Sequence, residues 1–381
     1  MTSAPRDRVV VAGTGMHPFG RFDGVTVTEM GVHAVRDALA DAGNPDFQAA
    51  FCATVYSGVA AGHKVLGALG RTGMPIVNVE AGCASGGAAL MLATGAIRAG
   101  QYDTVLVLGM EKMPKGIIRS SFFEPWREQA GLAATPAYFA LRAQRLMRES
   151  GITKDQLARV VVKNRANGID NPIAMFRTPT TAEDVLASRL VCEPLHLHML
   201  CSPNEGAAAV VLQRADVGPA GAPVVAAVAL RSHLPGSVLG EATPLSGVDD
   251  ADITPPSTLA ADAAFAEAGV APGDLDLVEC QDTDAAREIL AYEELGLCAR
   301  GDSARLIEDR TTARGGTLPV NLSGGLLSKG EPLGASALGQ VVELADHLRD
   351  RAGPRQLEGA RLGLAHTVGR GANAAVVILT R

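Results

Sequence analysis

The second half of this 381-residue chain repeats the order of strands and helices of the first half. In both halves, apolar runs rich in Val, Ile and Leu alternate with Ala-rich helical stretches. The first long helix of each half has the same kind of end, at Asp41-Ala42-Gly43 and at Glu267-Ala268-Gly269. An internal duplication of one α/β unit is the simplest explanation. A chain of this length also has room for two such cores.

The alternation predicts buried parallel strands that helices cover on both faces. Two such sheets packed back to back, with helices shared between them, would form five layers, α/β/α/β/α. Thr26 or Thr28 can cap the first helix, and Gly43 can end it. We expect helices over residues 28–42, 86–98, 257–268 and 334–349, and strands over residues 8–15, 53–58, 75–79, 104–109, 206–212, 224–230, 275–280, 361–365 and 374–379.

Residues 113–200 differ in character from the rest and read as an inserted loop domain over the sheet ends. Phe122, Phe123 and Trp126 in this insert either line an acyl pocket or pack the insert on the core, since pockets and cores use the same residue types. The Gly- and Pro-rich link at 216–223 predicts a boundary between an N-terminal half, 1–215, and a C-terminal half, 216–381.

Composition excludes several classes of function. The net charge of −7, without a basic run interleaved with aromatics, argues against a nucleic-acid partner. No apolar run approaches the ~20 residues of a membrane span. The six cysteines lack zinc-site spacing and predict reduced thiols in the cytoplasm. His196 and His198 lack an evident third ligand, so we predict no metal site. The Gly13-Thr14-Gly15 turn lacks the third glycine of a dinucleotide loop.

Cys83 lies where a β-favouring run, residues 75–79, meets a helix of small residues that begins near Gly86. A cysteine at such a turn meets the positive end of the helix dipole, which stabilises its thiolate. The glycines around it leave room for a substrate carbonyl and for backbone N–H donors. This pattern predicts a nucleophile. The alternative is a small buried apolar residue.

Several segments together make the chain resemble the thiolase superfamily, most closely the thiolases of sterol-carrier-protein type. The resemblance implies a duplicated five-layer fold, a homodimer or homotetramer, and an acyl thioester, usually of coenzyme A, as the substrate held at Cys83. It implies no tightly bound cofactor. The matching segments are Asn78 to Leu90, Gly109-Met110-Glu111-Lys112-Met113, the stretch from Cys201 to Ala209, the stretch from Ala291 to Cys298, Asn321-Leu322-Ser323-Gly324-Gly325, and the stretch from Lys329 to Ala335.

Two motifs depart from the family pattern. Gly330-Glu331-Pro332 stands where the family has Gly-His-Pro, whose histidine takes the proton of the nucleophile and helps to bind a thioester oxygen. Gln281-Asp282-Thr283-Asp284 stands where sterol-carrier-type thiolases have His-Asp-Cys-Phe, whose cysteine is an acid/base. A histidine usual for this subgroup remains in the final catalytic loop, at His366. Carbanion chemistry by the thiolase route should therefore be impaired.

The remaining residues suggest the following roles. His366 is the first candidate base for Cys83, because an ordinary imidazole titrates near neutral pH. Glu331 fits a buried neutral acid or a proton shuttle. Gln281 can donate to an oxyanion or fix a water. His366 can instead be a satisfied core histidine, and Glu331 a structural carboxylate at the start of the 334–349 helix. We expect the substrate-binding residues to be Thr283, Ser323, Gly324 and Gly369.

Three functions fit these residues. The first is an acyltransferase that forms an acyl-Cys83 thioester from an acyl-CoA or acyl-carrier-protein donor and passes the acyl group to an unusual acceptor in lipid or specialised metabolism. The second is a retro-aldol lyase that works with a small OB-fold partner protein, although such a lyase would not need Cys83. The third is a non-catalytic subunit of a hetero-oligomer. The retained cysteine favours the first.

Overall fold

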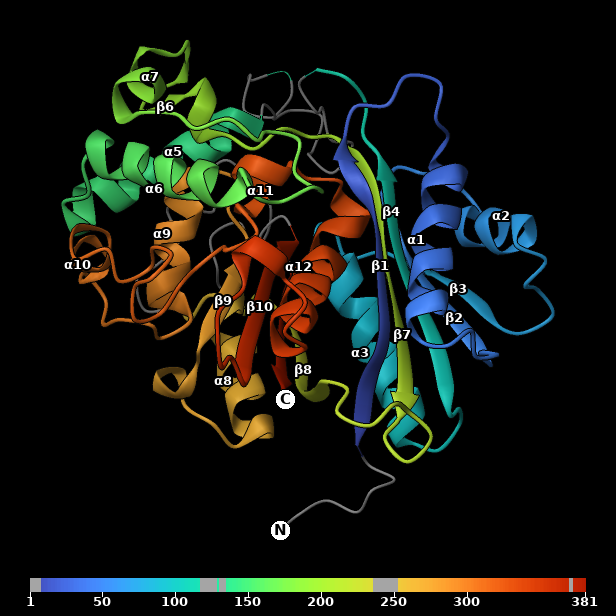
Figure 1. Cartoon of the computed structure of the whole chain (residues 1–381). Helices are drawn as coiled ribbons and strands as arrows, with labels where there is room; N and C mark the ends of the chain where they lie inside the picture. Colours follow the sequence, from blue (N-terminus) through green and yellow to red (C-terminus); the bar gives the residue numbers. More distant parts are fainter. Residues whose placement is uncertain (1–7, 117–128, 130–134, 236–252, 370–372) are drawn as a thin grey trace.

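The computed structural model describes residues 8–116, 129, 135–235, 253–369 and 373–381 (Figure 1). Phe122, Phe123 and Trp126, the aromatics expected in the insert, lie outside the described residues. No described helix is both long enough and apolar enough to cross a membrane.

The large strands form one nine-stranded mixed sheet in the order β3-β2-β4-β7-β1-β8-β11-β10-β9. Among the described strands, its two halves pair only between β1 and β8, at Val10 and Val224. The strands are β1 Val9–Gly20, β2 Ala49–Ala53, β3 Ile76–Val79, β4 Thr104–Lys112, β7 Glu205–Arg214, β8 Val224–Ser232, β9 Leu277–Cys280, β10 Leu362–Gly369 and β11 Asn373–Thr380.

The expectation of wholly parallel sheets is wrong. Strand β2 runs parallel to β3 and β4, and β9 runs parallel to β10. Strand β7, however, runs antiparallel to both β1 and β4, and β11 runs antiparallel to β8 and β10. The alternation of strands and helices indicates covering on both faces, but it does not indicate the direction in which a strand returns after a long insert.

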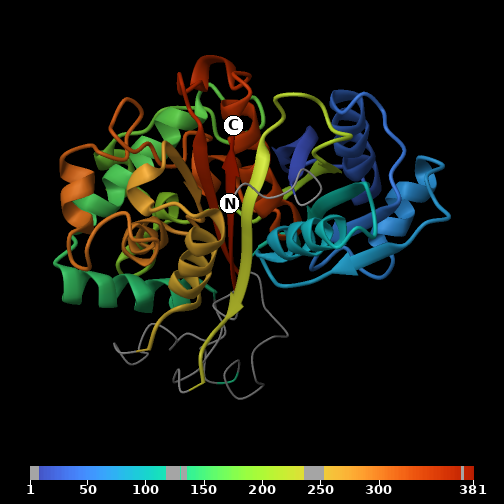
Figure 2. The same cartoon turned by 90° about the horizontal axis from the view of Figure 1, so that it is seen from below.

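The two halves of the sheet lie on opposite sides of a central helix pair, α3 (Ser85–Arg98) and α12 (Leu333–Leu348) (Figures 1 and 2). Helix α12 contacts β4 and β7 on one side and β10 and β9 on the other. Helices α1 (Val27–Asp41) and α2 (Ala61–Ala68) cover the outer face of the N-terminal half. Helices α8 (Pro256–Ala268) and α9 (Ala285–Glu294) cover the C-terminal half. The five-layered α/β/α/β/α fold is confirmed.

Local sequence explains where the first helix begins and ends. Thr26 is the N-cap of α1: its side chain accepts a hydrogen bond from the backbone N–H of Glu29, whose carboxylate in turn accepts one from the backbone N–H of Thr26. This capping box satisfies two donors that would otherwise lack partners. Gly43, just beyond the helix, has φ +80°, a conformation that glycine adopts without strain. The predicted start and end of this helix are therefore correct to within about one residue.

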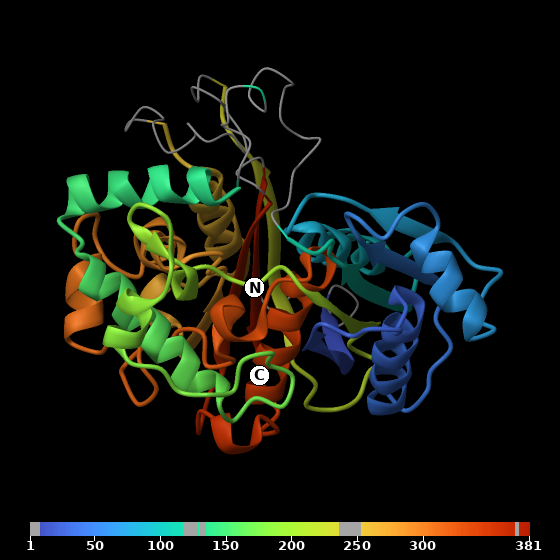
Figure 3. The same ribbon diagram turned by 90° about the horizontal axis from the view of Figure 1, so that it is seen from above.

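The insert packs on the C-terminal half, where its helices α5 (Thr135–Ser150) and α6 (Lys154–Gly168) contact α9 (Figure 3). Leu195–His196 is a short strand, but His198 follows in a 3-10 turn, so the two histidines do not share a strand face as expected. The boundary at residues 215–216 stays a prediction. The remaining elements are α5 Thr135–Ser150, α6 Lys154–Gly168, α7 Ala182–Ala187, β5 Leu190–Cys192, β6 Leu195–His196, α10 Ser303–Glu308 and α11 Gly325–Lys329.

Candidate active site

Cys83 lies in the tight turn between β3 and α3, one residue before the helix N-cap, and is 5% exposed. The turn is held by its own polar groups. Ser85 Oγ accepts a hydrogen bond from Ala81 N (2.8 Å) and donates one to Gly82 O (2.5 Å). The carboxylate of Glu80 accepts one from Gly82 N (2.7 Å). These bonds fix the cysteine at the positive end of a 14-residue helix.

Gly369, at the end of β10, lies directly against this turn. A Cβ atom added to Gly369 would lie 2.1 Å from Ala81 O, and one added to Gly82 would lie 3.1 Å from Gly369 Cα. Only glycine permits so close an approach of two backbones. The predicted site residue Gly369 thus helps to shape the Cys83 turn and joins the two halves of the chain there.

A carboxylate, an amide and a second thiol lie together beside the turn. Glu331, which is 5% exposed, accepts a hydrogen bond from Gln281 Nε2 (2.8 Å) and one from Cys201 Sγ (3.4 Å). The oxygen of the Gln281 amide accepts a hydrogen bond from Val368 N. Gln281 therefore orients Glu331 from β10, which differs from its predicted role as a free oxyanion donor, because its oxygen and one N–H are already engaged.

The pKa of the Cys201 thiol is raised well above its usual range. Burial is the largest cause, followed by the Glu331 carboxylate, and the charges of Asp282 and Cys83 add to the effect. Cys83 packs in one cluster with Met113 and Leu333, two residues after Glu331, and Met113 N donates to Asn204 O at 3.2 Å. We refer to Cys83, Cys201, Glu331 and Gln281 as the two-thiol cluster.

His366 does not fit its predicted role as the base for Cys83. Its neighbours Leu364 and Val368 belong to the outer core of the C-terminal half, whereas Thr367 bonds Gln340 of the central helix α12. Because side chains alternate along a strand, His366 points outward while Gly369 faces the Cys83 turn. Nε2 of His366 pairs with Ser257 Oγ of α8 at 3.0 Å. Burial, and then the charge of Arg287, lower the pKa of this imidazole to about 3.

The other predicted substrate-binding residues make contacts within the protein itself. Thr283 is buried and hydrogen-bonds Asp284 (3.3 Å). Ser323 donates to the Glu279 carboxylate through its hydroxyl and through its backbone N–H. A Cβ added to Gly324 would lie 2.7 Å from Gly168 Cα of α6. Contact of these three residues with substrate stays a prediction.

Nothing among the described residues groups three or more His, Cys, Asp or Glu side chains as a metal site. Of the two histidines considered and set aside as metal ligands, His196 has its Nδ1 2.7 Å from Ser188 O.

Two family models match the chain: "Thiolase, N-terminal domain" over residues 9–185 and "Thiolase C-terminal domain-like" over residues 243–381. An acetyl-CoA acetyltransferase of Methanothermobacter thermautotrophicus is 36% identical over 388 residues, covering 98% of this chain and 99% of the relative. This chain belongs to the thiolase family. The resemblance inferred from the motifs is confirmed.

Other proteins are similar to this chain over most of their length. Benzoylsuccinyl-CoA thiolase subunit BbsB of Thauera aromatica is 33% identical, over 96% of each chain. Sterol carrier protein 2 of Bos taurus is 33% identical, over 98% of this chain and 72% of the relative. Among solved structures, the Ltp2-ChsH2(DUF35) aldolase superposes with a TM-score of 0.87 at 24% identity, over 99% of this chain and 98% of that one. At that identity the likeness extends to the fold alone.

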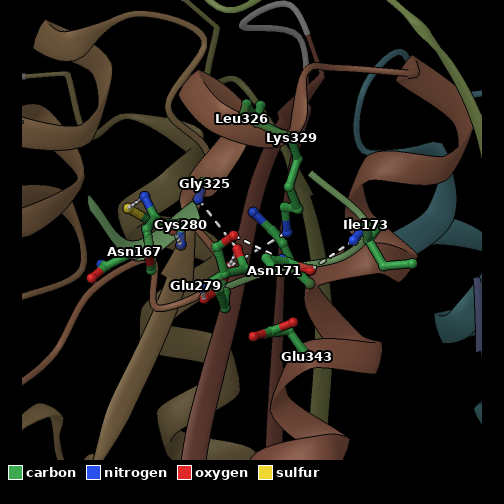
Figure 4. A network of polar contacts seen from close by, with 12 residues as sticks. Asn167, Asn171, Ile173, Glu279, Cys280, Gly325, Leu326, Lys329 and Glu343 are labelled. Atoms are coloured by element: carbon green, nitrogen blue, oxygen red, sulfur yellow. Dashed lines mark hydrogen bonds and ion pairs between the residues drawn. The ribbon is translucent and has the colours of Figure 1, made fainter. Parts of the chain in front are cut away.

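A buried ionic network supports the thiolase-family loop that carries Glu331 (Figure 4). Lys329, two residues before Glu331, is 2% exposed, and its Nζ lies 3.7 Å from the carboxylate of Glu279. Glu343 of α12 lies on the other side of this pair and accepts two hydrogen bonds from Arg355, at 2.7 and 3.0 Å. Removing one partner of such a buried pair would leave the other charge uncompensated.

Sequence reasoning missed Cys201 and Lys329 as members of the site. Both stand in segments that carry the family resemblance, but neither was given a role. The nearness of Cys201 to Glu331 depends on a backbone contact across 129 positions, in which Glu331 N donates to Ser202 O at 2.9 Å. No local pattern in the sequence reports such a contact.

Proposed function

We propose that this thiolase-family chain is an acyltransferase that forms an acyl thioester on Cys83 from an acyl-CoA or acyl-carrier-protein donor. The observation that carries the proposal is the position of Cys83 at the start of α3, packed in one cluster with Leu333, two residues after the buried Glu331 carboxylate that Cys201 contacts. The helix N-terminus favours the thiolate.

The cluster supports acyl transfer more readily than carbon–carbon bond chemistry. Forming the acyl-enzyme requires one proton to leave Cys83 and one to reach the departing thiol. Glu331 can accept the first. Deprotonating a carbon acid is harder than deprotonating a thiol. His366, the histidine that remains of the two in the family pattern, faces away from Cys83. We therefore propose an acceptor other than the usual one, such as an amine, a hydroxyl or an activated carbon.

We expect the protein to need no tightly bound cofactor, to work in the cytoplasm and to form a homodimer or homotetramer. The names of similar proteins support the donor: acetyl-CoA acetyltransferase and benzoylsuccinyl-CoA thiolase both name coenzyme A thioesters. Lipid metabolism fits the similarity to sterol carrier protein 2.

Intact-mass spectrometry tests the proposal. The purified protein is incubated with a panel of acyl-CoA esters, and its mass is read before and after hydroxylamine treatment, which cleaves thioesters. We expect a hydroxylamine-sensitive acyl adduct in the wild type and in Cys192→Ala, a control at a half-buried cysteine of the insert. We expect no adduct in Cys83→Ala. An adduct that persists in Cys83→Ala contradicts the proposal.

A retro-aldol lyase with a small OB-fold partner is the second candidate. The observation in its favour is that Glu331, a carboxylate, occupies the place where an imidazole is usual, because a carboxylate can deprotonate a hydroxyl group. One similar structure is named as an aldolase of Ltp2 with ChsH2(DUF35), and one relative is named as a subunit. Cleavage of a β-hydroxyacyl-CoA that Cys83→Ala retains would favour this candidate. Absence of both activities would favour a non-catalytic subunit.

A further inference from the structure

We propose that Cys201 is the proton donor to the thiol that leaves when Cys83 is acylated, with Glu331 as the shuttle between the two cysteines. This inference rests on the proposed acyltransferase function and assigns a role to a residue that the sequence motifs left without one. It follows from the placement of the two-thiol cluster.

Cys201 is held so that its thiol contacts Glu331 directly. Its backbone N–H donates to Thr283 O at 2.9 Å, and the next residue, Ser202, accepts from Glu331 N. These bonds fix both ends of the contact, and Sγ lies 3.4 Å from Glu331 Oε2 as the donor. Cys201 is only half-buried, whereas Glu331 is buried. Cys201 as a residue is thus less enclosed than Glu331, although its thiol is itself buried.

A neighbouring polar group is also left without a partner. Asn204 is fully buried, and its backbone N–H donates to Glu331 O at 3.4 Å. Its Nδ2 donates to Lys329 O at 2.8 Å, but its Oδ1 has no hydrogen-bond partner in the described part of the chain. Buried acceptors are normally satisfied. A donor from bound substrate or water beside Glu331 would complete this group.

The charges of the cluster make the proton transfer sequential. Burial and the Glu331 carboxylate raise the pKa of Cys201, so this thiol keeps its proton in the resting protein. When Glu331 takes the proton of Cys83, its negative charge disappears and no longer opposes ionisation of Cys201. Cys201 therefore becomes a stronger acid at the moment when the leaving thiolate needs a proton.

The step balances without any other reactant. The Cys83 S–H proton moves to Glu331, and the Cys83 sulfur forms a bond to the thioester carbonyl carbon. The bond from that carbon to the donor sulfur breaks, and Cys201 gives its proton to the departing thiolate. Glu331 then returns a proton to Cys201. The products are acyl-Cys83 and the free donor thiol, with Glu331 and Cys201 restored.

Two donors separate this role from a structural one. The first is an acyl-CoA. The second is a nitrothiophenyl thioester of the same acyl group, whose thiol leaves as a stable anion and needs no proton. Single-turnover acylation of Cys83 is followed by rapid quench and intact mass. Positioned proton donors contribute typically 100- to 10,000-fold, so Cys201→Ala should slow acylation by acyl-CoA about 100-fold and leave the aryl ester within about threefold.

Cys201→Ser is the companion variant, and Cys192→Ala, at a half-buried cysteine of the insert, is again the control. Serine keeps the size and the hydrogen bond but is a much weaker acid, so the acid role predicts that Cys201→Ser stays as slow as Cys201→Ala with acyl-CoA. Equal slowing with both donors, or full rescue by serine, would mean that Cys201 only holds Glu331 in place, and this inference would be wrong while the function stands. If the wild type acquires no adduct from either donor, the proposed function fails and the inference fails with it.

Discussion

Replacing Lys329 by Met tests the buried network beneath the Glu331 loop. The substitution keeps the length of the side chain but removes the charge that faces Glu279. Glu279 is 1% exposed, and among the described residues it would keep the two hydrogen bonds from Ser323. Removing one partner of a buried ion pair typically costs about 3–5 kcal/mol, because the other charge is left uncompensated. We therefore expect Lys329→Met to lower the free energy of unfolding by about that amount.

The double variant Lys329→Met/Glu279→Gln supplies the matched comparison. It removes both charges, so it should be more stable than Lys329→Met, although the Lys329 site has lost its ammonium in both. Lys115→Met is a control for loss of a lysine charge, because its ion pair with Asp23 is 74% and 94% exposed. An exposed pair of this kind contributes about 0–1 kcal/mol.

The pH dependence of stability provides a second test with Lys329→Met. Burial raises the pKa of Glu279, and Lys329 opposes that shift. Without Lys329, the pKa should rise further, so the folded state would bind a proton that the unfolded state releases above pH 4.5. Stability then falls as pH rises above that value. The deficit of Lys329→Met relative to wild type should therefore be smaller at pH 5 than at pH 8.

Urea denaturation followed by circular dichroism measures both effects. A loss below about 1 kcal/mol in Lys329→Met would place the pair among weak surface interactions and refute the reasoning. The loss in free energy of unfolding of the double variant should differ from the sum of the losses in Lys329→Met and Glu279→Gln, since residues in contact should couple. Equality with that sum would refute the reasoning as well.

Three further predictions concern the site and the first helix. Gly369→Ala places a Cβ 2.1 Å from Ala81 O and should slow acylation of Cys83 about 100-fold, since displacing a reacting group by about 1 Å costs that much. Gly363→Ala on the same strand, whose added Cβ meets leucine methyl groups, is the control. Similar acylation rates in both variants would contradict the close approach. His366→Leu should leave the acylation rate unchanged. The pKa of His366 is about 3 in the folded state, against 6.5 for the ordinary group. As pH falls through that interval, the wild type should therefore lose up to ~1.4 kcal/mol of stability per pH unit, and urea denaturation should show a smaller loss in His366→Leu. An acylation rate about 100-fold lower in His366→Leu would restore His366 as the base. Thr26→Ala removes the cap of α1 and should cost about 1 kcal/mol by urea denaturation, whereas no change would mean that water replaces the cap.

The sequence predicted the fold well because its signals are local and repeated. Thr26 and Gly43 define one helix, and small residues from Ser85 onward define the helix that Cys83 precedes. The directions of strands were harder to predict, because β7 pairs with β1 across almost 200 positions and its orientation depends on the path of the insert.

Some positions in the candidate site could likewise be predicted from local sequence, and others could not. Cys83 stands at a strand-to-helix turn that its neighbours define, so its position was predictable. His366 lies on a strand whose residues are buried on both faces, so hydrophobicity gave no indication of which face it occupies. The contacts among Cys201, Gln281 and Glu331 join three loops distant in the sequence. They could be found only once the structure had placed those loops together.

The most direct test of the central claim is the identity of the acylated residue. The wild-type protein is quenched in acid after a few seconds with a labelled acyl-CoA, digested at low pH, and mapped by peptide mass spectrometry. Acyl transfer through the Cys83 turn predicts that the label lies on the peptide that contains Cys83 and that unlabelled acyl-CoA chases it. Label on the Cys201 peptide alone, or on neither, would contradict the account.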